Sequence, residues 1–289
     1  MRIGTSNVVM ARFIGIVLMG PTCFFRTSAQ PLLHSVQAHH AVASSLGTID
    51  KHPFSVAVNP AAIARFRNTA WAFGGEQRFL APGWSTWAAG GILPVASGSW
   101  SFLVAQEGLP ALTDQLLMVT HAKRVSSQAS VGLSLGVNRK KAGANASILV
   151  PMAAAGISFS VSEQLYTGFS YTRLMWQGAD RYRPGDLSVL RCMLGYQPTD
   201  KFVWVFGVTK ESGRGAMGSS AICYQPSRKA KFWIGYSGSP ALCWFGLMLG
   251  IGKNVGVQVH SGIYSLVGVS NGMNVYSIPV EKIADQQVR

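Results

Sequence analysis

The stretch "ASVGLSLGVN", residues 129–138, alternates between apolar residues and small or polar ones along its whole length. In an extended chain its apolar residues share one face: Ala129, Val131, Leu133, Leu135 and Val137. Side chains of a strand point to opposite sides in turn, so this period of two predicts a two-faced β-strand rather than a helix. Residues 202–209 and 254–264 alternate in the same way. The sequence therefore predicts an all-β fold.

Turn-forming residues divide the chain after residue 65 into short segments of this kind. The candidate strands are residues 67–79, 84–95, 98–107, 115–125, 128–140, 145–161, 164–176, 186–197, 201–211, 215–225, 229–237, 240–252, 254–265 and 268–279. A tilted strand of about ten residues is long enough to cross a bilayer. We therefore predict an antiparallel transmembrane β-barrel of about 12–14 strands. It would occupy residues 65–280 and be followed by a C-terminal tail at 281–289.

The segment 142–161, "AGANASILVPMAAAGISFSV", is apolar enough to suggest a spanning helix instead. Pro151 lies in its middle, and its second half alternates between small and large residues. Proline in a helix interior removes a hydrogen bond and clashes with the preceding turn. We expect a long strand with a local break at Pro151, and the helix stays an alternative.

Composition favours a membrane over water for the outer face of these strands. Hydrophobic residues make up 48% of the chain and charged ones 12%, about half the usual charged share of soluble domains. A sheet in hydrocarbon must pair all of its backbone groups and so must close into a barrel. We expect most of the eight tryptophans near strand ends or on the apolar face, as interfacial girdles. A secreted soluble β-sandwich is the alternative fold.

The chain is strongly basic, with 25 Lys and Arg against 11 Asp and Glu. Such a balance occurs in proteins that bind nucleic acid and in those that contact anionic lipid. The charges here are scattered or lie at turn-like positions, and no nucleic-acid-binding motif accompanies them. We therefore expect outer-membrane lipid or lipopolysaccharide phosphates as partners and no nucleic acid.

The first 29 residues have the pattern of a cleavable signal peptide. Arg2 and Arg12 precede an apolar run from Phe13 to about Phe25, and small residues end at Ala29. The run is too short for a spanning helix. Export would leave three cysteines within strand-like runs, which we expect to be buried: Cys192, Cys223 and Cys243. No metal-binding spacing surrounds them, so neither a metal nor a cofactor is expected.

A polar break, "NPAAIA" at residues 59–64, comes just before the first candidate strand. Pro60 fixes φ and lacks a donor, and Asn59 can bond its own backbone, so Asn59, Pro60 and Ala61 should form a compact turn. Together with Gly75-Glu76-Gln77-Arg78-Phe79, this motif resembles the PorV/PorQ-type outer-membrane barrels of Bacteroidetes, which are distantly similar to the FadL fatty-acid transporters. The resemblance runs loosely over residues 38–280. It implies that residues 30–64 form a plug-like segment at or inside the barrel mouth.

The resemblance also implies a function. Such a barrel would lie in the bacterial outer membrane and would not be an enzyme. It would pass or bind a hydrophobic solute, or it would serve as a component associated with type IX secretion. Partners would then be a hydrophobic small molecule or secretion-system proteins.

A few polar residues could contact a solute or the plug. Glu76 and Arg78 share one face of the first strand, opposite Trp71, Phe73 and Phe79, and we expect them in the lumen, since a lipid-facing charge is costly. His121 and Lys123 share a face, which we also expect to line the lumen, as does His260 beside Gln258. The structural interpretation of Glu76 and Arg78 is a salt bridge that holds the inner segment.

One enzymatic alternative remains. A barrel enzyme that modifies lipids would need a histidine near a serine and an acid. His121 and Ser134 are the pair that could serve, although strand spacing cannot establish their contact.

Overall fold

The computed structural model describes residues 51–143, 146–175, 187–227, 229–238, 241–252, 254–265 and 268–277. Within them the chain forms three short 3-10 helices and fourteen strands: η1 (Pro53–Ala57), η2 (Pro60–Arg65), β1 (Ala70–Gln77), η3 (Arg78–Leu80), β2 (Ser85–Val95), β3 (Gly98–Leu109), β4 (Leu112–Arg124), β5 (Ala129–Ala142), β6 (Ala146–Ser160), β7 (Leu165–Leu174), β8 (Leu187–Thr199), β9 (Phe202–Glu211), β10 (Ala216–Ser227), β11 (Ala230–Gly238), β12 (Ala241–Ile251), β13 (Val255–Tyr264) and β14 (Gly268–Ser277). The expected signal peptide, residues 30–50 of the expected inner segment and the tail at 281–289 lie outside the described residues.

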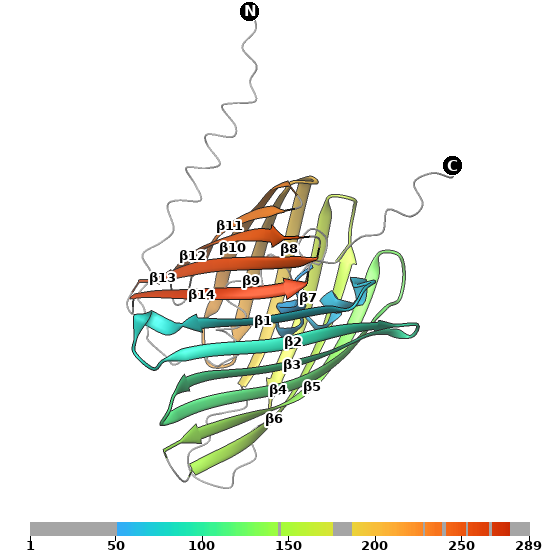
Figure 1. Cartoon of the computed structure of the whole chain (residues 1–289). Coiled ribbons are helices and arrows are strands. Elements are labelled where there is room, and N and C mark those ends of the chain that lie inside the picture. The colour runs from blue at the N-terminus through green and yellow to red at the C-terminus, as the bar shows by residue number, and fades with distance from the viewer. Residues whose placement is uncertain are drawn as a thin grey trace, which may run out of the picture.

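The strands pair in chain order, each antiparallel to the next, and β1 pairs with β14 to close the ring (Figure 1). The predicted antiparallel barrel is confirmed, with fourteen strands. The alternative of two stacked sheets is wrong, because a closed ring leaves no sheet edges. An even number of strands brings both ends of the wall to the same side. We call this side, where β1 begins and β14 ends, the terminus end, and the opposite side the loop end.

Strand alternation gives the wall two unlike faces. Leu133 and Leu135 are 66% and 70% exposed, whereas Ser130 and Ser134 on the same strand are buried. Large apolar side chains are exposed in the same way on every strand from β1 to β9, and on β11 to β14. Exposing so much apolar surface to water would cost about 25 cal/mol per Å². The outer wall is therefore suited to hydrocarbon, as in membrane barrels.

The segment before β1 lies inside the ring of strands (Figure 1). Every residue of η1 is buried, as are Pro60 to Ala64 of η2. The two helices contact the inner faces of β1 to β6. Both are short turns with proline at the start, where its missing N–H does no harm. Residues 51–66 are called the inner segment from here on.

The tryptophans divide between the two faces. Three are exposed on the outer wall, as predicted: Trp71, Trp87 and Trp100. Trp233 and Trp244 instead point inward and are buried, because Phe232, Ile234 and Phe245 occupy the outward positions of β11 and β12. Trp176 lies outside the described residues.

The same alternation corrects the expectation for the cysteines. Cys223 is buried, but Cys192 and Cys243 are exposed on the outer wall. Each of these two precedes a buried inward residue, Met193 and Trp244, so its own side chain must face outward. Both thiols therefore face the side of the wall that suits lipid.

Residues 146–160 form a single strand, so the preference for a strand over a helix is confirmed. The expected break at Pro151 does not occur on the side of β5, where the register continues from Ala142↔Ala146 to Ala129↔Phe159. On the other side, pairing with β7 begins only at Met152. Proline has no N–H to offer that neighbour, which explains why it occurs where pairing with β7 ends. None of the helices in the described part of the chain is long and apolar enough to cross a bilayer.

Candidate functional site in the barrel interior

The inner segment is held by its Asn-Pro-Ala turn. Asn59 is completely buried and caps η2: its Oδ1 accepts from the Ala61 N–H at 3.0 Å. Its Nδ2 donates to the Ile157 carbonyl of β6 at 3.1 Å. The predicted compact turn is confirmed, and the same side chain also ties the turn to the barrel wall.

Two glycines let this turn approach the wall. A Cβ on Gly132 of β5 would lie 2.5 Å from the carbonyl carbon of Pro60, and one on Gly156 of β6 would lie 2.1 Å from Asn59 Oδ1. Any side chain at either position would push the turn away. We call the inner surface around Gly132 and Gly156 the seat.

Further bonds hold the inner segment around the seat. Ser170 Oγ of β7 donates to the Val58 carbonyl at 2.7 Å, and Arg65 Nη2 donates to Ser160 Oγ at 2.9 Å. Burial lowers the pKa of Arg65, neighbouring Tyr166 raises it and Arg124 lowers it further. The segment therefore contacts the wall along its length and narrows the interior at the terminus end.

Across the barrel the interior is filled by large side chains instead. Trp233, Trp244 and Met248 point inward from β11 and β12 and are nearly fully buried. Here, too, a glycine makes room: a Cβ on Gly235 would lie 2.4 Å from ring atoms of Trp244. We call this surface, formed by Trp233, Trp244 and Met248, the aromatic wall. Its side chains make this part of the interior apolar.

The loop end of the interior carries charge. Glu76, Arg78 and His260 are all buried there, which matches the predicted inward placement. Glu76 Oε2 lies 3.8 Å from His260 Nε2, and Arg78 Nε lies 3.6 Å from Glu107 Oε1. These two contacts thus reach across to β13 and β3 at the loop end. The hypothesis that Glu76 and Arg78 hold the inner segment stays a prediction.

The alternation predicted that Arg78 lies on the first strand, but Arg78 follows that strand. β1 ends at Gln77, and residues 78–80 form η3, in which Phe79 has a φ of 55°. This left-handed backbone turns Phe79 inward, where its ring meets those of Trp84 and Tyr264 at 5.4 and 5.1 Å. The Arg78 guanidinium lies over the rings of Phe79 and Tyr264. The prediction that Phe79 faces outward is therefore wrong.

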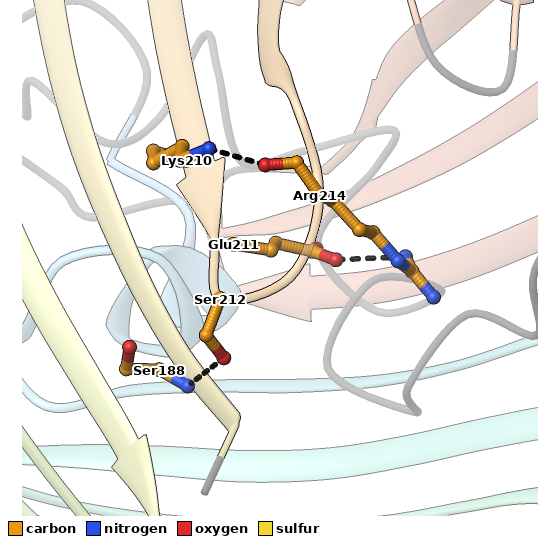
Figure 2. A network of polar contacts seen from close by, with 5 residues as sticks. All are labelled: Ser188, Lys210, Glu211, Ser212 and Arg214. Atoms are coloured by element: carbon orange, nitrogen blue, oxygen red, sulfur yellow. Dashed lines mark hydrogen bonds and ion pairs between the residues drawn. The ribbon is translucent and has the colours of Figure 1, made fainter. Parts of the chain in front are cut away.

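A second polar group lies at the loop end of β8 and β9 (Figure 2). Glu211, fully buried, bonds Arg214 of the following turn at 2.7 Å. Lys210 donates to the Arg214 carbonyl, and Ser212 Oγ accepts from the Ser188 N–H at 3.0 Å. Buried Arg191 of β8 interacts electrostatically with Glu211. These bonds hold the β9–β10 turn in place and put charge on a second side of the loop end.

His121 and Lys123 are not lumen residues, which corrects the prediction. Leu116, Met118 and Ala122 of the same strand are the buried, inward ones, so alternation turns His121 and Lys123 outward. The prediction correctly placed His121 and Lys123 on the face opposite the inward residues of β4. It assigned the wrong face to the lumen, because β4 has apolar residues on both faces.

The same finding removes the proposed enzyme pair. Ser134 points inward and shares a hydrogen bond of 2.7 Å with Thr120, on the opposite side of the wall from His121. Among the described residues no group of three or more His, Cys, Asp or Glu side chains is placed to hold a metal ion.

Several interior residues escaped the sequence analysis. Glu107, Arg191 and Glu211 alternate with outward apolar residues, so strand parity alone could have placed them inside. The aromatic wall could not be found in this way, since a tryptophan suits either face.

No protein-family model and no curated protein matches the chain. Solved structures share its fold. The toluene transporter TbuX of Ralstonia pickettii superposes with a TM-score of 0.56 at 11% identity, covering 82% of this chain and 96% of that one. The CymD monoaromatic hydrocarbon channel gives 0.58 at 11% identity, covering 86% and 99%. The toluene transporter TodX of Pseudomonas putida gives 0.55 at 10% identity, covering 89% and 98%.

Identities this low show a common fold and nothing finer. What the three structures show is that this chain shares the barrel fold of proteins described as toluene transporters and a monoaromatic hydrocarbon channel, and the relation to the FadL transporters stays a prediction. The closer likeness to the PorV/PorQ type and to Bacteroidetes stays a prediction.

Proposed function

We propose that this protein is an outer-membrane barrel that passes or binds a hydrophobic solute and performs no chemistry on it. The observation that carries the proposal is the unlike filling of the interior. A tied-down inner segment lies on one side and the apolar aromatic wall on the other. The inward side chains on that side are apolar or aromatic, Trp233, Trp244 and Met248, which favours apolar or aromatic molecules over sugars or ions.

The charged loop end fits the same function. Arg78, Glu107 and Glu211 are buried in ion pairs and buried Glu76 lies 3.8 Å from His260, so these side chains narrow and shape the loop end rather than lead ions through it. The fold is that of proteins described as toluene transporters and a monoaromatic hydrocarbon channel. Monoaromatic hydrocarbons are therefore the first solutes to test.

The test compares cells that produce the protein with cells that lack it. We expect faster uptake of toluene and unchanged uptake of a sugar of similar size. Substituting Trp244→Phe should preserve uptake, and filling the interior by Gly246→Trp should reduce it, because a Cβ there already lies 3.5 Å from the ring of Trp233. Equal uptake of toluene with and without the protein, together with equal uptake of a long-chain fatty acid, would remove the proposal.

The second candidate is a component associated with type IX secretion, supported by the Asn-Pro-Ala and Gly-Glu-x-Arg-Phe elements of the sequence. It predicts that cargo accumulates in the periplasm when the gene is deleted, while solute uptake is unchanged. Export by a signal peptide at residues 1–29 belongs to both candidates. It predicts a mature protein that begins at Gln30 and is recovered with the outer membrane.

A further inference from the structure

We propose that the outer wall across β4 to β8 binds one glycerophospholipid with a net negative headgroup. Its phosphate would lie on Lys123 and one acyl chain over Ala155. The inference rests on the proposed membrane location, but not on which solute the barrel carries.

The wall is hollowed at this place. A hollow of about 550 Å³ lies between large outward side chains of β5 to β8: Val131, Leu133, Ile157, Phe169, Tyr171 and Leu190. Ala155 pairs with Leu133 on one side and with Tyr171 on the other. A methyl group between two large side chains leaves the gap. The hollow is lined almost entirely by apolar atoms, as an acyl chain requires.

The hollow runs obliquely through the wall. Strand pairing places His121, Leu133, Ala155, Tyr171 and Leu190 in one row across five strands. The row begins three residues from the terminus end of β4 and ends three residues from the loop end of β8. Because barrel strands are tilted, a row perpendicular to them climbs through the membrane. An acyl chain along it would enter the bilayer from one interface.

The terminus end of the row has the features of a headgroup level. Trp100, 46% exposed, stacks on His121 with ring centroids 4.6 Å apart, and tryptophan is enriched at membrane interfaces. Lys123 is exposed beside them and also borders the hollow. A lysine at this level attracts phosphate.

No carboxylate on the outer face of the described strands competes for Lys123. The acidic residues of those strands all take inward positions: Glu76, Glu107, Asp114 and Glu211. The outer face carries cations instead, so its charge is complementary to an anionic headgroup.

The inner segment keeps the hollow open. Behind Ala155 the inner segment packs against the seat, because Pro60 and Asn59 lie close to the backbone of β5 and β6 there. Asn59 also bonds the carbonyl of Ile157, a residue that borders the hollow. Backed in this way, the wall cannot collapse inward to close the groove. A site on the outer face is thus maintained by the motif on the inner face.

The test uses the purified full-length protein, delipidated in detergent, with phosphatidylglycerol as the probe and native mass spectrometry to measure retained lipid. Ala155→Trp fills the hollow and Lys123→Gln removes the cation. Ala153→Trp is the matched control, since Ala153 lies on the same strand and face but outside the hollow. Arg139→Gln is the control for charge, on the outer face of β5 near the loop end. We expect at least a tenfold loss of phosphatidylglycerol retention in the first two variants and none in the controls.

Heat-modifiable gel mobility establishes that each variant is folded. Equal retention in Ala155→Trp and Ala153→Trp, or full retention in Lys123→Gln, would overturn the lipid site. If Ala155→Trp slows toluene uptake while phosphatidylglycerol retention is unchanged, the hollow serves a solute and the lipid proposal is wrong. If Ala155→Trp and Lys123→Gln lose phosphatidylglycerol while the controls retain it, and the wild type takes up no toluene, the lipid site stands and only the proposed function is wrong.

Discussion

The seat and the aromatic wall solve the same problem, filling the inside of a fourteen-stranded ring, in opposite ways. At the seat the inward residues are small, Gly132 and Gly156, because another piece of the chain occupies the space. The helices η1 and η2 make their main contacts with β1 to β6, and at the aromatic wall Trp233 and Trp244 occupy the interior positions. The size of inward side chains therefore records where the inner segment lies. The two regions should respond differently to changes in side-chain volume.

The largest expected effect is at the aromatic wall. Trp244→Ala removes a side chain that is 2% exposed and leaves a cavity in its place. We expect a loss of about 3–5 kcal/mol in the free energy of unfolding. Urea titration in lipid vesicles measures it. Trp244→Phe keeps most of the ring and should lose less than about 1.5 kcal/mol. Equal losses in the two variants would show that packing does not hold this wall.

At the seat the opposite change should be harmful. Gly156→Leu places a side chain where Asn59 Oδ1 already lies, and we expect a loss of about 3 kcal/mol and release of the inner segment. Trypsin cleavage at Arg65 in the folded barrel reports the release. Gly218→Leu is the control, because nothing lies within 4 Å of a Cβ there. If trypsin spares Arg65 in Gly156→Leu as in the wild type, the seat does not position the segment.

The fold could be read from the sequence because each strand repeats one simple signal. Alternation placed all fourteen strands within a few residues of their bounds and identified the outer face of β5, β9 and β13. It failed where apolar residues occupy both faces, as at His121 and Lys123 of β4, and where a strand ends early, as before Arg78.

What fills the ring was beyond the same reasoning. The Asn-Pro-Ala motif predicted its turn, since the bonds from Asn59 to Ala61 are local. Nothing in the spacing could tell that Gly156, almost a hundred residues later, would receive that turn. Nor could alternation decide which tryptophans point inward, because an indole is stable both in a packed interior and at a membrane interface. Contacts between distant segments therefore required the structure.

The hydrogen bonds of the turn make a smaller contribution than the packing at its seat. Asn59→Ala removes both the cap on Ala61 and the bond to Ile157. The Ala61 N–H and the Ile157 carbonyl then each lose this hydrogen bond. We expect a loss of about 1–3 kcal/mol and faster trypsin cleavage at Arg65. Asn271→Ala, at an exposed position of β14, should change neither quantity. Unchanged cleavage in Asn59→Ala would mean that glycine packing alone holds the segment.

The smallest effect is expected from single hydroxyl groups on this side of the barrel. Ser170→Ala breaks one bond, to the Val58 carbonyl, and should cost about 0.5–1.5 kcal/mol. Ser158, a buried serine on the neighbouring strand, has no hydrogen-bond partner for its hydroxyl among the described residues. Ser158→Ala should therefore be neutral or slightly stabilising, although it removes the same atom from the same wall. If Ser158→Ala lowers the free energy of unfolding as much as Ser170→Ala does, the hydroxyl groups contribute through packing. The bond from Ser170 to Val58 would then not be what ties the inner segment to β7.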